Sequence, residues 1–323
     1  MTAMHFRAAA LLAAAFSAGA CLAQSFPARP VRIVSPFPAG GGTDIVARLI
    51  ARQMGENTGQ TFVVENRVGA AGMIGCEAVA RAAPDGYTLL MGTTGTHTTN
   101  PAVFARMSYD PIRDFSPVSL VAALPFVLVV HPSVPVRTLK ELVALAKARP
   151  EVLNYASSGV GGIAHLGFAL LNTMAGTRMT HVPYKGSPLQ TQATVAGEIA
   201  MTLDSIAVTQ PFVKAGRIRA LGIGATRRSP LMPEVPTIAE AGLPGYELVV
   251  WYALFAPAAT PAEIVRQLQR EVVRGLAGRS VPQDFGALGA EPVGGTPDEL
   301  SAVVQRDLKK WAKVARDAGV KAD

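Results

Sequence analysis

The sequence of 323 residues lacks features that mark several large classes of protein. It has only two cysteines, too few for a disulfide-stabilised scaffold. Aromatic residues make up 6% and no run of five like charges occurs, so we interpret the net charge of +7 as basic residues on a solvated surface, not a nucleic-acid groove. Beyond the N-terminal segment no stretch approaches 18 uninterrupted apolar residues, and the mature chain is not expected to span a membrane.

Signatures of catalysis and of cofactors are also missing. No Gly-x-Ser-x-Gly elbow occurs, and no Cys/His or paired-carboxylate spacing suggests zinc. The glycines of segment 159–164 have dinucleotide-like spacing, but segment 179–186 lacks the acidic residue that the ribose would need. We therefore expect neither metal nor cofactor. The alternative is a secreted hydrolase with a triad drawn from Ser157, Ser158, His165 and Asp204.

The first 23 residues have the pattern of a secretion signal. A basic start ends at Arg7, and an apolar run covers residues 8–20. We expect cleavage after Ala23; the alternative is a lipoprotein anchor at Cys21. Either event leaves Cys76 as the one cysteine that could still react, and we interpret it as a small buried core residue, with a reactive thiol as the alternative.

The rest of the chain, 49% apolar and 16% charged, predicts an α/β fold in two lobes. Strand and helix patterns alternate from Val31, and residues 118–130 form an apolar stretch that we interpret as consecutive strands crossing into a second lobe. The pattern restarts there, and Tyr246–Ala256 is the natural return crossing. We expect a mostly parallel sheet in each lobe, with lobe 1 formed by residues 24–124 and 247–323 and lobe 2 by residues 125–246.

The most informative segment is a strand, a glycine-rich turn and a helix start between Val31 and Asp44. Three consecutive glycines let backbone N–H groups approach a ligand, and the helix start adds the positive end of a dipole. This combination suits an anion. Asp44 is expected to cap the helix, or to receive a cationic group or ring N–H of the ligand. The expected ligand-binding residues of this turn are Phe37, Ala39, Gly40, Gly41, Thr43 and Asp44.

The second lobe repeats this arrangement after its first strand, with Ser157, Ser158, Gly159 and Gly162 expected to bind the ligand from the opposite side. His165 follows in the next helix, where it either faces the cleft or is a hydrogen-bonded structural histidine. Other polar residues follow strands at their carboxyl ends, where ligands of α/β folds bind. These further expected ligand-binding residues are Thr94, Thr96, Lys185, Gly186 and Asp204, with a surface lysine and a helix cap as the alternatives for Lys185 and Asp204.

A collinear series of short blocks, from about residue 27 onward, resembles the Bug family, also called TctC-like. These proteins are the periplasmic solute-binding components of tripartite tricarboxylate transporters. The matching blocks include Pro36-Phe37-Pro38-Ala39-Gly40-Gly41, Pro84-Asp85-Gly86-Tyr87 and His181-Val182-Pro183-Tyr184-Lys185-Gly186. Val68 departs from the family pattern, where proline is common, as do Thr58 and Thr61, all outside the presumed cleft.

The resemblance implies a type II periplasmic-binding-protein fold that closes on a small organic carboxylate without catalysing a reaction. It also implies a periplasmic location, a monomer, and delivery of the ligand to a membrane permease. The family's ligands include amino-acid dicarboxylates, citrate-like acids and aromatic carboxylates, and the sequence does not choose among them.

Overall fold

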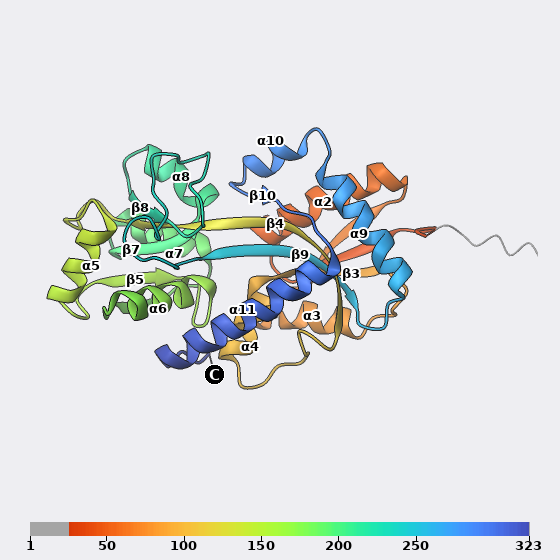
Figure 1. The fold of residues 1–323 in the computed structure, drawn as a ribbon, viewed down its shortest axis with the longest axis horizontal. Helices are drawn as coiled ribbons and strands as arrows, with labels where there is room; N and C mark the ends of the chain where they lie inside the picture. Colours follow the sequence, from red (N-terminus) through yellow and green to blue (C-terminus); the bar gives the residue numbers. More distant parts are fainter. Residues whose placement is uncertain (1–25, 323) are drawn as a thin grey trace, which may run out of the picture.

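The computed structural model describes residues 26–322, so the expected secretion signal and Cys21 lie outside the described residues. Two α/β lobes lie side by side, joined by two long strands that run through the middle of the molecule (Figure 1). In the first lobe β1 (Val31–Ser35) pairs in parallel with β2 (Phe62–Asn66) and β3 (Thr88–Thr93). Helices α2 (Gly42–Thr58) and α3 (Met73–Ala80) connect these strands, as expected for βαβ units.

The second lobe repeats the parallel arrangement. Here β5 (Asn154–Ser157) pairs in parallel with β6 (Thr180–Pro183) and β7 (Met201–Ser205). Helix α6 (Ile163–Ala175) follows β5, and α7 (Ser187–Ala196) follows β6. The helix α8 (Ile206–Lys214) begins directly after β7. In both lobes, therefore, helices start at the carboxyl ends of strands, where the sequence predicted the site.

The two joining strands are β4 (Phe115–Val130) and β9 (Val249–Pro257), which are antiparallel to each other. Strand β9 also pairs with β3, and β4 also pairs with β7, so a continuous mixed sheet runs in the order β2-β1-β3-β9-β4-β7-β5-β6. The predicted series of strands over 118–130 is wrong, because β4 is one strand of 16 residues. Pro125 lies within it opposite Val249, and two shifts of register occur nearer its start.

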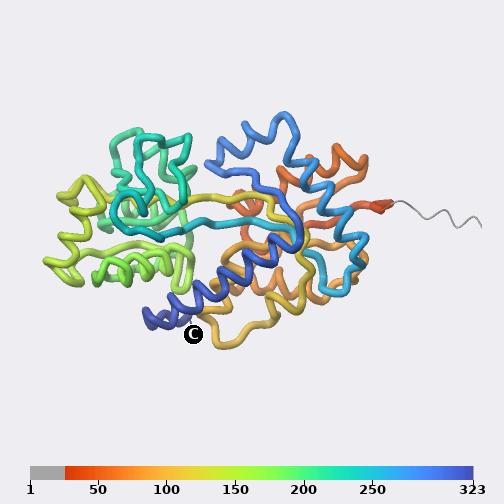
Figure 2. Tube along the Cα trace, viewed as in Figure 1, coloured from red at the N-terminus to blue at the C-terminus, as the bar shows by residue number. Residues whose placement is uncertain are grey.

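The remaining elements cover the sheet and complete the two lobes, and Figure 2 shows the path of the chain through them. They are η1 (Ala70–Gly72), η2 (Gly95–Thr99), α4 (Asn100–Val103), α5 (Leu139–Ala148), β8 (Arg219–Ile223), α9 (Ala262–Leu276), α10 (Val281–Gly286), β10 (Glu291–Pro292) and α11 (Pro297–Ala318). Helix α11 crosses the junction of the lobes (Figure 1). Among the helices of residues 26–322, none is long and apolar enough to cross a membrane.

Two faces of β9 pack into different layers, because side chains alternate along a strand. Tyr252 and Leu254 belong to the core beneath α2 and α9, whereas Trp251 and Phe255 belong to the core beneath α3 and α11. Cys76 lies in the second of these cores, fully buried, and burial raises its pKa to about 12. The interpretation of Cys76 as a core residue is confirmed.

Helix α3 begins at Met73, three residues before Cys76. Gly72 adopts a left-handed φ of 87° and turns the chain into the helix. Gly75 lies inside α3, where a Cβ would lie 2.9 Å from Pro36 Cα. This glycine is required for the close approach of α3 to the start of the first glycine-rich turn.

Candidate functional site

The first glycine-rich turn leads directly into α2. Gly40 adopts a left-handed φ of 79°, and Gly41 is the N-cap, with no side-chain hydrogen bond to the first turn of the helix. Phe37 is half-buried, whereas Ala39 and Gly40 are exposed. The first backbone N–H groups of α2 therefore lack a side-chain acceptor at an accessible turn, as the sequence predicted.

Asp44 organises this turn through its buried carboxylate. The prediction that it caps α2 as the N-cap is wrong, because the helix begins two residues earlier, at Gly42. Its Oδ2 accepts hydrogen bonds from Gly40 N (2.9 Å) and Arg48 Nε (3.0 Å), and its Oδ1 accepts one from Asn66 Nδ2 (2.9 Å). Burial raises the pKa of Asp44, but these hydrogen bonds outweigh burial and hold the pKa below its ordinary value.

The second turn, after β5, is held by two histidines. The Ser157 hydroxyl is buried, donates to Gly159 O (2.9 Å), and lies 2.6 Å from His181 Nε2. His165 Nδ1 accepts a hydrogen bond from Gly161 N (3.1 Å), and its ring stacks on His181 with 3.7 Å between centroids. Burial lowers the pKa of both histidines to about 4, so both rings are neutral near pH 7. These are the contacts of a hydrogen-bonded structural histidine.

Asp204 is buried at the end of β7, and its carboxylate holds the start of α7. Its Oδ2 accepts hydrogen bonds from Ser187 Oγ (2.6 Å), Gln190 Nε2 (2.8 Å) and Thr191 Oγ1 (2.8 Å), while Oδ1 accepts from Ser205 N (2.7 Å). Burial raises the pKa of Asp204, although the hydrogen bonds oppose the shift. The contacts of Asp204 thus position α7 and α8.

Of the other predicted site residues, Thr94 and Thr96 are buried, whereas Lys185 and Gly186 lie closer to the surface. Thr94 and Thr96 are fully buried, and their hydroxyls bond to the backbone of β9 and β3. The Thr96 methyl lies 3.0 Å from where a Cβ of Gly72, the N-cap of α3, would be. Lys185 is exposed and, within residues 26–322, forms no ion pair, whereas Gly186 is the N-cap of α7 with φ 110°.

Four helices that begin at the carboxyl ends of strands share one property. Helices α2, α6, α7 and α8 start at the N-caps Gly41, Gly162, Gly186 and Ser205, and none of these caps makes a side-chain hydrogen bond. By contrast, α5 and α11 have complete capping boxes built on Thr138 and Thr296. The N-caps of α3, α4, α9 and α10 also lack a side-chain hydrogen bond, but α2, α6, α7 and α8 start at strand ends of the two lobes, where an anion could accept from their first N–H groups.

The sequence analysis did not single out Tyr252. Its hydroxyl lies beside the start of α2 in the first lobe and near Asp204, at the end of β7, in the second. A Cβ on Gly42 would lie 2.7 Å from the Tyr252 hydroxyl. Burial raises the pKa of Tyr252, and the charge of Asp204 adds to the shift. The hydroxyl is thus a protonated donor beside α2 and near the end of β7. Side chains alternate along a strand, so Val250, Tyr252 and Leu254 share one face of the predicted crossing. This pattern, with a polar hydroxyl on an apolar face, was the signal that could have identified Tyr252.

Several hydroxyls around these helix starts make no hydrogen bond within the described part of the chain. They belong to Thr43, Ser158, Ser205 and Tyr252, from both lobes and from the joining strand β9. The buried hydroxyls of Ser157, Thr94 and Thr96 already have internal partners. Free hydroxyls and uncapped amides together supply neutral donors that suit a carboxylate.

The described residues contain no group of three or more His, Cys, Asp or Glu that could hold a metal ion. The hydrolase alternative finds no support in these contacts. The carboxylate of Asp204 bonds to α7 and Ser205, not to His165, and the Ser157 hydroxyl is fully buried. His165 Nδ1 already accepts a backbone N–H.

Comparisons with known proteins agree with this geometry. A family described as "Tripartite tricarboxylate transporter family receptor" matches residues 46–320. The chain is 36% identical to protein BugT of Bordetella pertussis over 93% of its own length and 92% of BugT. It is similar to R. palustris Rpa4515, solved with adipate, with 41% identity, a TM-score of 0.83, and 92% and 99% of the two chains covered.

A second solved relative is MatC of Rhodopseudomonas palustris, solved with bound malate. Its identity to this chain is 38% and its TM-score 0.78, and the match covers 90% of this chain and 99% of MatC. The type II periplasmic-binding-protein fold predicted from the sequence is confirmed by these structures. The chain belongs to the tripartite tricarboxylate transporter receptor family of solute-binding proteins, the TctC or Bug proteins.

Proposed function

We propose that this protein binds a small organic carboxylate between its lobes and delivers it, as a monomer in the periplasm, to the permease of a tripartite tricarboxylate-type transporter. The observation that carries the proposal is the set of uncapped helix starts from both lobes, with the Tyr252 hydroxyl between α2 and the end of β7. Relatives solved with adipate and malate support a carboxylate. The protein acts by binding, without catalysing a reaction.

In this proposal the carboxylate of the ligand accepts from the N–H groups of Gly42 and Thr43 and from the Thr43 hydroxyl, next to Gly41, whose own N–H donates to Pro38 O at 3.3 Å. From the opposite side the second turn supplies the Ser158 hydroxyl. It lies next to Gly159 and Gly162, whose N–H groups donate within the turn to Ser157 Oγ (3.2 Å) and Gly159 O (3.2 Å). Asp44, Ser157, His165 and Asp204 position these donors instead of touching the ligand. Phe37, Ala39, Thr94, Thr96, Lys185 and Gly186 form the surroundings of the two turns.

The lobes, residues 24–124 with 247–323 and residues 125–246, close on the ligand by bending β4 and β9. Closure brings donors from both lobes onto one ligand, so the ligand stabilises the closed arrangement by its differential affinity.

Isothermal titration calorimetry with adipate, malate, citrate, aspartate and benzoate tests the proposal. We expect saturable binding of at least one acid and no turnover of the matching esters and amides. Gly41→Val should weaken that binding about tenfold or more, because a branched side chain blocks approach to the backbone N–H groups, while Gly41 φ of −77° suits any residue. Turnover of an ester without saturable binding of any acid would contradict the proposal.

A further inference from the structure

The net positive charge of the described chain is concentrated in its second lobe. Residues 125–246 contain 11 Lys and Arg against 6 Asp and Glu, whereas residues 26–124 and 247–322 together contain 18 against 16. Most of the excess therefore lies on fewer than half of the described residues. Basic residues spread evenly over the surface would not give this asymmetry.

The topology of the second lobe places the starts of four strands at one end of the molecule. Strands β5, β6, β7 and β8 run in the same direction, and β4 runs against them, so β4 ends where they begin. Backbone hydrogen bonds join the segments there, from Glu151 N to Arg178 O and from His131 N to Ala200 O. Helix α5 follows β4 at this end, which is the left end of the molecule in Figure 1.

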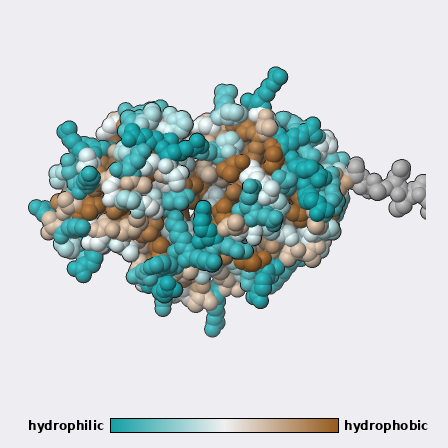
Figure 3. All heavy atoms as spheres, viewed as in Figure 1, coloured by the Kyte–Doolittle hydropathy of each residue, from teal (hydrophilic) through white to brown (hydrophobic). Residues whose placement is uncertain are grey.

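Basic residues gather at this end of the lobe, which we call the basic end. Six lie in the segments that enter or leave the strands here, namely Arg137, Arg149, Arg178, Lys214, Arg217 and Arg219, and α5 adds Lys140 and Lys147. All are exposed except Arg219, which is half-buried and donates to Val136 O at 2.6 Å. The same segments contain three acidic residues, Glu141, Glu151 and Glu198, so the basic end has a net charge of +5. Figure 3 shows hydrophilic side chains projecting from this end.

Most of these cations lack an internal partner. Within residues 26–322, Arg178 alone of the eight forms an ion pair, with Glu151 at 3.8 Å. The first lobe shows the reverse, because every Arg of residues 26–124 except Arg106 forms an ion pair within the described chain. The charge of the basic end is therefore available to a partner outside the chain.

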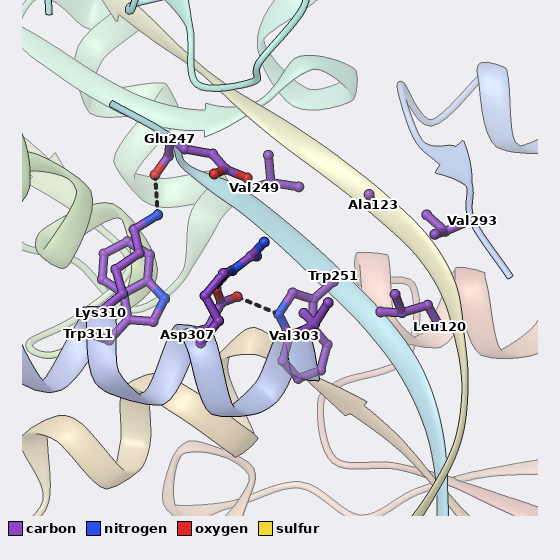
Figure 4. Close-up of a pocket in the computed structure, with 11 residues that line it drawn as sticks. Leu120, Ala123, Glu247, Val249, Trp251, Val293, Val303, Asp307, Lys310 and Trp311 are labelled. Carbon is purple, nitrogen blue, oxygen red and sulfur yellow. Dashed lines mark hydrogen bonds and ion pairs between the residues drawn. The ribbon is translucent and has the colours of Figure 1, made fainter. Parts of the chain in front are cut away.

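A second group of charges, beside α11, is balanced instead. A hollow of about 170 Å³ there is lined by two cations, Arg306 and Lys310, and by two anions, Glu247 and Asp307 (Figure 4). Arg306 Nε lies 2.9 Å from Asp307 Oδ1, and Lys310 donates to the backbone oxygen of Glu247 at 2.7 Å. This group is neutral as a whole, so it attracts an anionic partner far less than the basic end does.

The composition of the basic end favours a lipid surface over a nucleic acid. The segments that form it, 131–153, 176–179, 197–200 and 214–219, contain no Phe, Tyr or Trp on which a base could stack. Val152 lies among the cations and is 66% exposed, the highest value among the large hydrophobic side chains of the described residues. An exposed apolar side chain surrounded by cations is typical of surfaces that bind at the boundary of an anionic membrane.

We propose that the basic end binds the surface of a membrane that contains anionic phospholipids. The Lys and Arg side chains contact lipid phosphates, and Val152 packs at the boundary of the acyl chains. The inference rests on the proposed function, because a receptor that serves a membrane permease works beside such a surface. Strands β5 and β7 end at the second turn and at Ser205, so a membrane at their starts leaves the proposed ligand site uncovered.

Cosedimentation with vesicles tests this inference. The probe is vesicles of phosphatidylglycerol and phosphatidylcholine in equal parts, and vesicles of phosphatidylcholine alone are the control. We expect saturable binding to the anionic vesicles at about 0.02 M KCl, and binding weakened about tenfold or more at about 0.2 M KCl, because salt screens exposed charges. Phosphatidylcholine vesicles should bind the protein more weakly by about tenfold or more, because they lack the negative surface potential.

The triple variant Arg149→Gln/Lys214→Gln/Arg217→Gln removes three cations from the basic end. Each Lys or Arg near an anionic surface strengthens binding about fivefold, so this variant should bind the anionic vesicles about a hundredfold more weakly. The single variants Lys214→Gln and Arg217→Gln should each bind about fivefold more weakly, and they keep the test decisive if the triple variant does not fold.

The matched control is Arg274→Gln/Arg279→Gln/Lys309→Gln, which makes the same change in net charge outside the second lobe. These three residues are exposed and, within residues 26–322, form no ion pair. Because they lie far from the basic end along the chain and exposed charges are screened over about 10 Å, the control should weaken vesicle binding less than about threefold.

Three results would overturn the inference. They are the absence of binding to anionic vesicles at the lower salt concentration, equal weakening by the two triple variants, and displacement from the vesicles by DNA of the same phosphate concentration, which would indicate a general affinity for polyanions. Calorimetry with carboxylates keeps the inference separate from the proposed function, because the triple variant of the basic end should bind its acid as the wild type does. A wild type that binds vesicles but no acid would contradict the proposed function alone.

Discussion

At the scale of single residues, the role of each hydroxyl follows from whether it already has a partner. Tyr252 and Tyr246 are both buried tyrosines, but they differ in this respect. The Tyr246 hydroxyl donates to Gly167 O at 3.0 Å inside the second lobe, whereas the Tyr252 hydroxyl has no partner in the described residues and lies beside Gly42. The Tyr252 hydroxyl is therefore available to a ligand.

Tyr252→Phe removes this donor and keeps the ring. We expect about tenfold weaker binding of the carboxylate, because a hydrogen bond to a charged group contributes about 1.5–3 kcal/mol, with little change in the free energy of unfolding. Tyr246→Phe is the matched control, expected to lower the free energy of unfolding by about 1 kcal/mol and to leave affinity unchanged. Calorimetry and urea denaturation measure both. Equal affinities for the two variants would remove Tyr252 from the site.

Asp204 shows how a predicted ligand residue can act through its neighbours. Asp204→Ala leaves the donors of Ser187, Gln190 and Thr191 without their acceptor, two of them on residues 1% exposed. We expect the free energy of unfolding to fall by about 3 kcal/mol, measured by urea denaturation. Asp317→Ala, at an exposed pair with Lys313, is the control and should leave the unfolding midpoint unchanged. A fully stable Asp204→Ala variant would refute this positioning role.

At the scale of elements, the stacked rings of His165 and His181 make the stability of the turn before α6 depend on pH. Their pKa of about 4 in the folded chain lies below the ordinary 6.5, so the unfolded chain binds more protons between these values. Stability from this pair is therefore present above pH 6.5 and is lost as pH falls towards 4. We expect a loss of about 2 kcal/mol over that window, less than the two shifts would give in full because solvent screens these incompletely buried rings. Ligand binding should also weaken, because a protonated Nδ1 of His165 no longer accepts the Gly161 N–H.

His165→Asn tests this dependence, because the asparagine side-chain oxygen can replace Nδ1 as the acceptor and does not titrate. Urea denaturation from pH 4 to 7 should show a shallower dependence of stability on pH than in the wild type. His131→Gln is the control, since His131 bonds to Ser133 at the far end of β4 and should leave the profile unchanged. A profile in His165→Asn identical to that of the wild type would contradict the assignment.

Elements with a local signal could be predicted from the sequence. The alternation of strands and helices, and the glycine-rich turns after β1 and β5, carry their own patterns. Strand β4 could not be recognised as one element, because Pro125 normally interrupts a strand and only pairing with β9 shows how it is accommodated. The positioning roles of Asp44 and Ser157 could not be predicted either, because their hydrogen-bond partners Asn66 and His181 are distant in the sequence.

At the scale of the whole molecule, two strands and one helix connect the lobes, and this limits how the lobes can move. Strands β4 and β9 pair with each other along most of their length, and α11 packs on both lobes. Bending of these three elements permits a hinge motion, whereas sliding of one lobe past the other would break the pairing. A ligand that bonds to both lobes should therefore close the molecule about this hinge.

We expect a carboxylate that binds, supplied at 100 times its Kd, to raise the free energy of unfolding by roughly 2.7 kcal/mol. Small-angle scattering under the same conditions should show a smaller radius of gyration, because closure brings the lobes together. The methyl ester of the same acid is the control: it keeps the carbon skeleton but lacks the charge that the uncapped N–H groups of α2 and α6 would bind, so neither quantity should change. Stabilisation by the acid with an unchanged radius of gyration would mean that the ligand occupies one lobe alone, and the proposed closure would be wrong.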